Sequence, residues 1–108
     1  MIEYTVLVKP QDGLSKSAFF DEWLEPHFEA ITRLPGLQAA TFKEIVYAPG
    51  FDTRFHGIGL LQFENVDAVM RALTSTEGRE VRVHSGSLID QTSVVRLLAR
   101  NRASWRRP

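Results

Sequence analysis

Three histidines, His27, His56 and His84, are the side chains of this sequence best suited to moving a proton. Imidazole titrates near neutral pH, and a neutral ring in apolar surroundings can take a proton from carbon or from a phenol. His27 is the strongest candidate, because helical periodicity places it near the middle of an apolar face in residues 15–36. The alternative is a core histidine that is satisfied by one hydrogen bond.

The other two histidines also have a functional and a structural interpretation. His56 opens an expected strand, where it could serve as the acid to His27 as base, or orient a carboxylate substrate. The alternative for His56 is a solvent-facing residue after a loop. His84 lies on an expected short helix near Ser85 and Ser87, and we count it among the substrate-binding candidates.

Other kinds of site lack their sequence signatures. No HxH, HxxxH or HxxE pattern occurs, so we expect no metal, although residues distant in sequence can still converge in space. The absence of cysteine excludes thiol catalysis and disulfides. Neither a glycine-rich phosphate loop nor a nucleophile-elbow serine is present. We therefore expect acid–base chemistry without a cofactor.

Composition is that of an ordinary soluble globular protein. The 108 residues suggest one domain, with 44% hydrophobic residues and a formal net charge of zero. All 13 acidic residues lie in residues 1–90, whereas residues 91–108 carry five arginines and no acid. This basic end could bind an acidic partner, or be a solvated or partner-docked terminus. We expect no nucleic-acid or membrane partner, no signal peptide and a cytoplasmic location.

The element that must position His27 is the helix expected over residues 15–36. Phe20, Leu24 and Phe28 define its predicted apolar face, together with Ile31 and Leu34, and Trp23 extends one flank. Ser15 is a suitable N-cap, and Pro35-Gly36 ends the helix. Pro26 lies inside the pattern, so we expect a bend or break near residues 22–26.

The other elements follow a regular alternation. Strands are expected at residues 2–9, 37–47, 55–63 and 92–99, with a helix at 66–74 capped by Asn65 and a short helical segment at 76–84. This β-α-β-β-α-β order predicts an α+β, ferredoxin-like fold with both helices on one face of a four-stranded antiparallel sheet. Several strands are apolar on both faces, so we expect a second copy to cover the other face in a homodimer.

Five stretches in this order resemble the EthD family of dimeric α+β barrel proteins. The most specific is FFDEWLEPHFEAITRLPGL, with its spacing of Trp23, His27 and Pro35-Gly36. The others are YTVLVKPQDGLS, FHGIGLLQFEN, STEGREV and IDQTSVV, and together they reach about residue 100. We accordingly divide the chain into an EthD-like domain at residues 1–100 and a basic tail at 101–108.

The resemblance implies a dimeric barrel with a pocket between sheet and helices in each subunit. Proteins of this fold include methylmuconolactone methylisomerases, aromatic polyketide cyclases, cofactor-free quinone-forming monooxygenases and haem-degrading enzymes, so fold alone does not fix the chemistry. This chain has Leu60 where family members commonly carry an acid, Gln62 where they have an aromatic, and His56 where they often have Asp. A substrate therefore cannot be transferred from a relative.

Three functional hypotheses follow. The first is a cofactor-independent isomerase, cyclase or monooxygenase that begins by proton abstraction from a small aromatic, lactone or polyketide-like substrate. Its catalytic residues would be His27 and His56, and its substrate-binding residues Trp23, Phe28, Tyr47, Leu60 and His84. The second hypothesis is a non-catalytic ligand-binding or accessory protein of a degradation pathway. Haem binding is the third.

Overall fold

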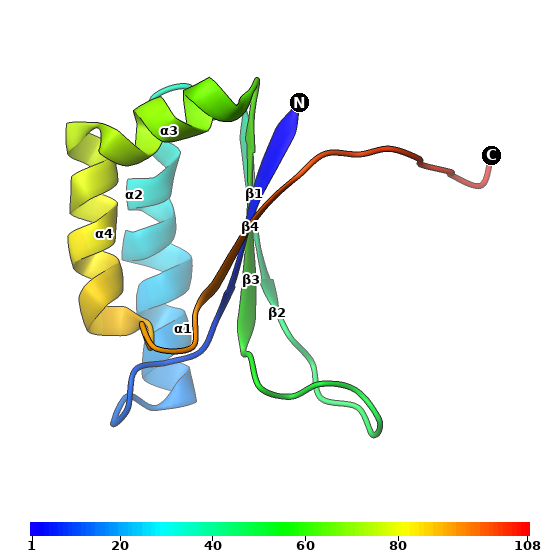
Figure 1. Ribbon diagram of the computed structural model, residues 1–108. Coiled ribbons are helices and arrows are strands. Elements are labelled where there is room, and N and C mark those ends of the chain that lie inside the picture. Colours follow the sequence, from blue (N-terminus) through cyan, green and yellow to red (C-terminus); the bar gives the residue numbers. More distant parts are fainter.

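The computed structural model describes all of residues 1–108 and has one four-stranded antiparallel sheet with its helices on one face (Figure 1). The strands are β1 (Ile2–Val8), β2 (Ala39–Glu44), β3 (Gly57–Phe63) and β4 (Val95–Ala99), in the spatial order β2-β3-β1-β4. The helices are α1 (Lys16–Glu22), the π-helix η1 (Trp23–His27), α2 (Phe28–Thr32), α3 (Val66–Thr74) and α4 (Thr76–Leu88). The predicted ferredoxin-like α+β topology is confirmed.

The helix starts follow from local side-chain hydrogen bonds that satisfy free backbone N–H groups. The Ser15 hydroxyl accepts from the backbone N–H of Ala18 at 3.1 Å, and the Asn65 amide oxygen accepts from that of Ala68 at 2.8 Å. Both N-caps were predicted. Helix α4 is longer than the predicted segment of residues 76–84, because Leu88 is buried in the core and holds the last turn in place.

Pro26 changes the helix type without ending the helix. Proline has no N–H to donate, and here it lies within η1, whose wider π turn carries the chain from α1 into α2. The buried residues of this segment are spaced four apart, at Phe19, Trp23, His27 and Ile31. The prediction that Leu24 belongs to the buried face was therefore wrong, since Leu24 is 45% exposed. The π turn instead brings Trp23 and His27 to the face that packs on the sheet.

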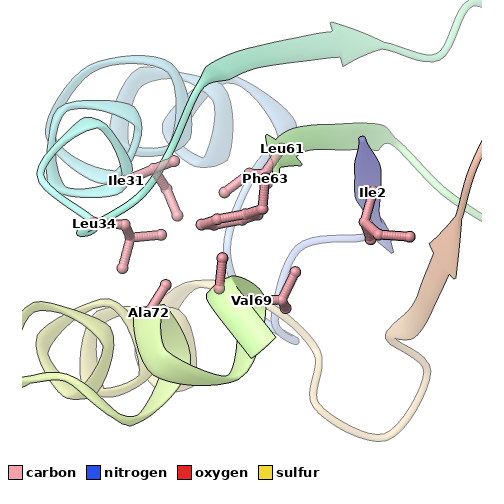
Figure 2. Close-up of a cluster of buried hydrophobic side chains, with 8 residues drawn as sticks. Ile2, Ile31, Leu34, Leu61, Phe63, Val69 and Ala72 are labelled. Carbon is pink, nitrogen blue, oxygen red and sulfur yellow. The ribbon is translucent and has the colours of Figure 1, made fainter. Parts of the chain in front are cut away.

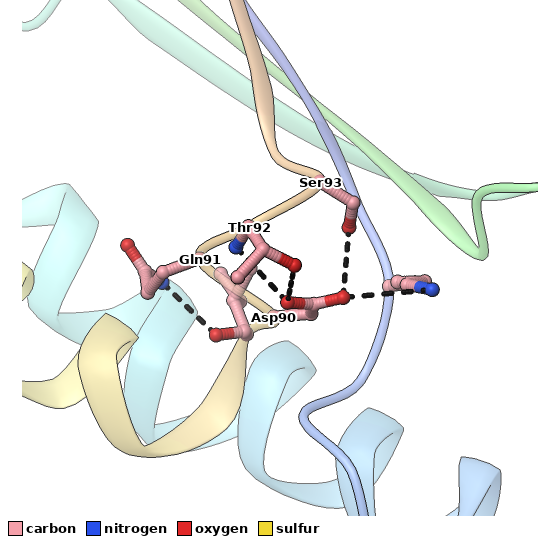
Figure 3. A network of polar contacts seen from close by, with 6 residues as sticks. Asp90, Gln91, Thr92 and Ser93 are labelled. Carbon is pink, nitrogen blue, oxygen red and sulfur yellow. Dashed lines mark hydrogen bonds and ion pairs between the residues drawn. The ribbon is translucent and has the colours of Figure 1, made fainter.

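The strands begin later or end earlier than their apolar patterns predicted. Before β4, the Asp90 carboxylate accepts hydrogen bonds from the Thr92 backbone N–H, the Thr92 hydroxyl and the Ser93 hydroxyl, and pairs with Lys9 at 3.5 Å (Figure 3). The bonds from Thr92 are the main reason why the pKa of Asp90 falls to about 2. This turn occupies residues predicted as strand and fixes the entry of β4 beside the end of β1.

The core divides into two clusters along the sheet. One contains Phe63 and Leu61 of β3 with residues from α2, α3 and β1 (Figure 2). Its buried members are Ile2, Ile31, Leu34, Leu61, Phe63, Ala68, Val69 and Ala72. The other cluster joins Val8, Phe19, Trp23, Leu88 and Ile89 near the opposite end of the helices. Burial of each large side chain contributes about 1.5–3 kcal/mol, so the two clusters hold the helices on the sheet.

The second face of the sheet has no helix over it, and the C-terminal residues run away from the sheet on that side (Figure 1). Trp105 is 75% exposed and contacts the guanidinium of Arg107 at 5.1 Å, so it does not dock on the body of its own chain. None of the helices is long and apolar enough to cross a membrane.

Candidate functional site

A cavity of about 470 Å³ lies between the helices and the sheet, and its wall includes members of both core clusters. Twelve of its eighteen lining residues are hydrophobic, and none is acidic. Its polar or charged side chains are His27, Arg82, Ser85, Gln91 and Arg96. The remaining lining residues are Tyr4, Val6, Trp23, Ile31, Leu34, Phe42, Leu61, Phe63, Leu73, Gly78, Val81, Ile89 and Val94. A volume of this size is typical of small-molecule sites.

Trp23 forms part of the cavity wall because β3 leaves room for its ring. A Cβ atom on Gly57 would lie 2.5 Å from the Trp23 ring, so only glycine allows this approach. The indole stacks on Phe42 of β2 with the ring centroids 4.3 Å apart. The indole thus occupies the space that Gly57 leaves open, and it gives the cavity an aromatic wall.

His27 is held by a second histidine, which comes from the neighbouring helix α4. Its Nδ1 atom lies 3.0 Å from Nδ1 of His84 in α4. The Nε2 atom of His84 in turn lies 3.5 Å from a carboxylate oxygen of Glu22, the last residue of α1. The site is therefore a chain of carboxylate, imidazole and imidazole, and its last ring faces the cavity.

The contact between the two Nδ1 atoms needs one donor and one acceptor, so only one of these atoms carries a proton. The Glu22 carboxylate beside His84 suits a proton on Nε2 of that ring. In the arrangement in which Nδ1–H of His27 donates to Nδ1 of His84, Nε2 of His27 carries a free lone pair.

Nε2 of His27 makes no hydrogen bond within the chain. It is not fully buried, because the only fully buried side-chain nitrogen or oxygen without a partner is Nδ1 of His56. Burial lowers the pKa of His27 to about 4, with His84 as a second cause. The ring is therefore neutral at pH 7 and has the form required of a proton acceptor.

Four of the seven predicted site residues lie at or beside the cavity. Trp23 and His27 line it, and His84 contacts His27. Phe28 packs edge-on against Phe42 with the ring centroids 4.9 Å apart, although it does not line the cavity. The pairing of His27 with His84, and the part played by Glu22, were not predicted, because they depend on how η1 packs against α4.

The other three predicted residues lie elsewhere. Tyr47 is 78% exposed in the loop between β2 and β3. Leu60 lies on the uncovered face of β3, because side chains alternate along a strand and its neighbours Gly59 and Leu61 face the helices. His56 precedes β3 and is held by its backbone, whose N–H donates to the Val8 carbonyl at 2.8 Å. None of the three lines the cavity.

Two cavity arginines were missed by the sequence analysis. Arg96 pairs with Val6 across β1 and β4, so both side chains lie on the face that carries the helices. The signal was available, since alternation in the predicted strand of residues 92–99 puts Arg96 on the same face as Val94. Arg82 lies on α4, within the helical segment predicted at residues 76–84, and strand alternation says nothing about its direction. No group of three or more histidine, cysteine or acidic residues is arranged to hold a metal ion.

Comparison with known proteins supports the fold. No protein-family model and no curated protein sequence matches this chain. The structure is similar to an EthD family protein from Bacillus halodurans, at 17% identity and a TM-score of 0.75, covering 94% of this chain and 99% of that one. The resemblance to EthD proteins in the sequence is thus confirmed at the level of the fold.

Two further solved structures bear on the architecture and on the chemistry of the fold. One is a dimeric ferredoxin-like protein of unknown function from Thermobifida fusca, with 11% identity, a TM-score of 0.71, and coverage of 91% of this chain and 88% of that one. The other is SnoaB, a cofactor-independent oxygenase from Streptomyces nogalater, with 14% identity, a TM-score of 0.69, and coverage of 95% and 94%. This chain shares the ferredoxin-like fold of all three proteins.

Proposed function

We propose that this protein is a small cofactor-independent enzyme whose reaction begins when Nε2 of His27 takes a proton from its substrate. The observation that carries the proposal is the His27–His84 contact of 3.0 Å, which ties up one nitrogen of His27 and leaves the other free at a cavity. The substrate would be a small aromatic, lactone or polyketide-like molecule with an acidic C–H or O–H. Isomerisation, cyclisation and oxygenation can all follow from the resulting anion.

Each part of the site has a physical role in this reaction. The Trp23 and Phe42 rings offer flat apolar surface to an aromatic or unsaturated ring. The apolar wall excludes water, which strengthens the electrostatic interactions inside it. As His27 gains a proton, its Nδ1–H bond to His84 becomes charge-assisted, and the Glu22 carboxylate stabilises the positive charge. This scheme does not use His56, which was predicted as the acid or as the group that orients a carboxylate substrate.

A pKa of about 4 suits this base only if the substrate raises it, and the reaction itself supplies the cause. Proton abstraction leaves a negative charge beside the new imidazolium, and an opposite charge within a few ångströms favours the protonated ring. The basicity of His27 thus rises along the reaction coordinate, while the empty site stays neutral.

The uncovered sheet face supports a homodimer. Leu7, Ile58, Leu60 and Leu97 lie on it, and an apolar sheet face of this kind needs cover. The Thermobifida fusca protein of the same fold is described as dimeric. We expect a dimer by sedimentation at micromolar concentration, and a Leu60→Glu variant should be monomeric. A monomeric wild-type protein would contradict this assembly.

Proton abstraction is testable before the natural substrate is known. Small aromatic, lactone and polyketide-like compounds with an acidic C–H are incubated with the protein in D₂O, and loss of the C–H signal is followed by NMR. Exchange that the wild type catalyses and His27→Gln does not is the expected result. Equal exchange by both proteins would overturn the role of His27.

A second candidate function is ligand binding without chemistry, as in a carrier or a sensor. It is favoured by the low pKa of His27, because a weakly basic ring is a weak proton acceptor. Tight binding of a compound that undergoes neither exchange nor turnover would favour this function.

A further inference from the structure

We infer that the cavity selects ligands bearing a carboxylate, and that the Arg96 guanidinium binds this group with Arg82 as a second cation. The inference rests on the proposed function and names its substrate class: a small, flat, unsaturated or aromatic carboxylic acid. The supporting observations are the positive charges of Arg82 and Arg96 and the place of both residues in the cavity wall.

The charges on the cavity wall are all of one sign. Arg82 and Arg96 line the cavity and no aspartate or glutamate does, although the whole chain has as many acidic as basic residues. A cleft with apolar walls and charges of one sign focuses the electric field and concentrates ions of the opposite sign. A neutral His27 adds no charge of its own. The empty cavity therefore attracts anions.

Arg96 is free to bind a ligand. Arg96 is exposed and forms no ion pair within the chain, so its cationic guanidinium is available to a ligand. The fork of N–H donors matches both oxygens of a carboxylate. Arg82 is partly engaged, because its side chain donates to the Leu73 carbonyl at 3.2 Å. Arg96 is therefore the main anion-binding group.

Three elements bring these groups to one cavity. His27 comes from η1, Arg82 from α4 and Arg96 from β4. A ligand whose carboxylate is held by Arg96 can extend its ring over the apolar wall and offer a C–H to Nε2 of His27. The arginines would also stabilise the negative charge that forms when this proton leaves.

The test compares two probes of equal shape, 1-naphthoate and its neutral analogue 1-naphthamide. Trp23 lines the cavity and Trp105 is the only other tryptophan, so a Trp105→Phe protein makes Trp23 the sole indole reporter. Binding is measured by quenching of Trp23 fluorescence at pH 7. Variants Arg96→Gln and Arg82→Gln are made in this protein, with Arg71→Gln of α3, which does not line the cavity, as the matched control.

We expect the parent protein to bind naphthoate at least about tenfold more tightly than naphthamide, the size of a charge-assisted hydrogen bond. Arg96→Gln should remove most of this preference without weakening naphthamide, Arg82→Gln should remove less, and Arg71→Gln none. Equal affinity for both probes in the parent, no quenching by either, or equal effects of Arg96→Gln and Arg71→Gln would overturn the inference.

The preference for naphthoate and the proton exchange that depends on His27 can each fail without the other. His27→Gln should keep the preference for naphthoate while it abolishes proton exchange. If His27→Gln exchanges protons as well as the wild type, the proposed function fails and the anion preference can still hold. If the preference is absent while exchange depends on His27, the carboxylate inference alone fails.

Discussion

His27 is buried and His56 is half-buried, and the two rings also differ in what holds them. Burial is the first cause of a lowered pKa for both rings, followed by His84 for His27 and by Lys16 and Lys9 for His56. Nδ1 of His27 has a partner and Nε2 is free at a cavity. Nδ1 of His56 is buried with no partner, and the ring does not line this cavity. A low pKa alone therefore does not identify a base.

The backbone explains why the two histidines came to differ. His56 is held between strands, since its N–H donates to the Val8 carbonyl at 2.8 Å and its carbonyl accepts from Ile45 at 2.9 Å. His27 lies in the π turn around Pro26, where the side chain is directed to α4 and the cavity. π-helical turns inside α-helices occur frequently at functional sites.

The largest expected effect is on turnover. His27→Gln should lower kcat by about 10²–10⁴-fold, the usual contribution of general base catalysis, whereas His56→Gln should change it less than about threefold. Both are measured on a substrate found by the exchange screen, with circular dichroism as the control for folding. Equal losses in the two variants would break the distinction between the two histidines.

The pH dependence of the free energy of unfolding should also distinguish the two histidines, with the larger contribution from His27. The unfolded chain protonates His27 near pH 6.5, and the folded protein does so only near pH 4. The unfolded state therefore binds more protons in this window, and the free energy of unfolding falls by roughly 3 kcal/mol as pH drops through it. His27→Gln should remove this term in urea titrations from pH 7.5 to 4. His56→Gln should remove a smaller term of the same sign, and a larger one would reverse the comparison.

Gly57 links the two regions, because it follows His56 and makes room for the Trp23 ring. Gly57→Ala places a Cβ atom 2.5 Å from that ring, and we expect a loss of about 1–3 kcal/mol in urea unfolding. Gly86→Ala is the matched control, because a Cβ there meets nothing within 4 Å. Equal stability of the two variants would show that the indole has room to move.

The smallest effect is expected at Glu22, which is more than half exposed and 3.5 Å from His84. Glu22→Gln should lower kcat about three- to tenfold with little change in KM, because its charge acts on the proton of His84 and not on the substrate. Glu25→Gln, also exposed and without an ion pair, is the control. A change confined to KM would assign Glu22 to substrate binding instead.

The sequence predicted the order of elements, the Ser15 and Asn65 caps and an inward-facing His27, because these depend on neighbours close in the chain. It missed the π turn, which follows from how the helix packs around Pro26. The contact of His27 with His84 joins residues 57 positions apart and needs the packing of η1 on α4. Leu60 was assigned to the pocket from its place in a family pattern, and Tyr47 as an aromatic residue that could line it. Neither assignment could take account of the strand face of Leu60 or of the loop that carries Tyr47, and neither residue lines the cavity.

The protonation state of His27 tests the central claim most directly. Long-range ¹H–¹⁵N NMR spectra of the histidine rings, recorded from pH 7.5 to 3.5, report the tautomer and the pKa of each ring. The expected result is a neutral His27 with its proton on Nδ1, a bare Nε2 and a pKa of about 4. A proton on Nε2 at pH 7, or a pKa of His27 near 6.5, would contradict this account.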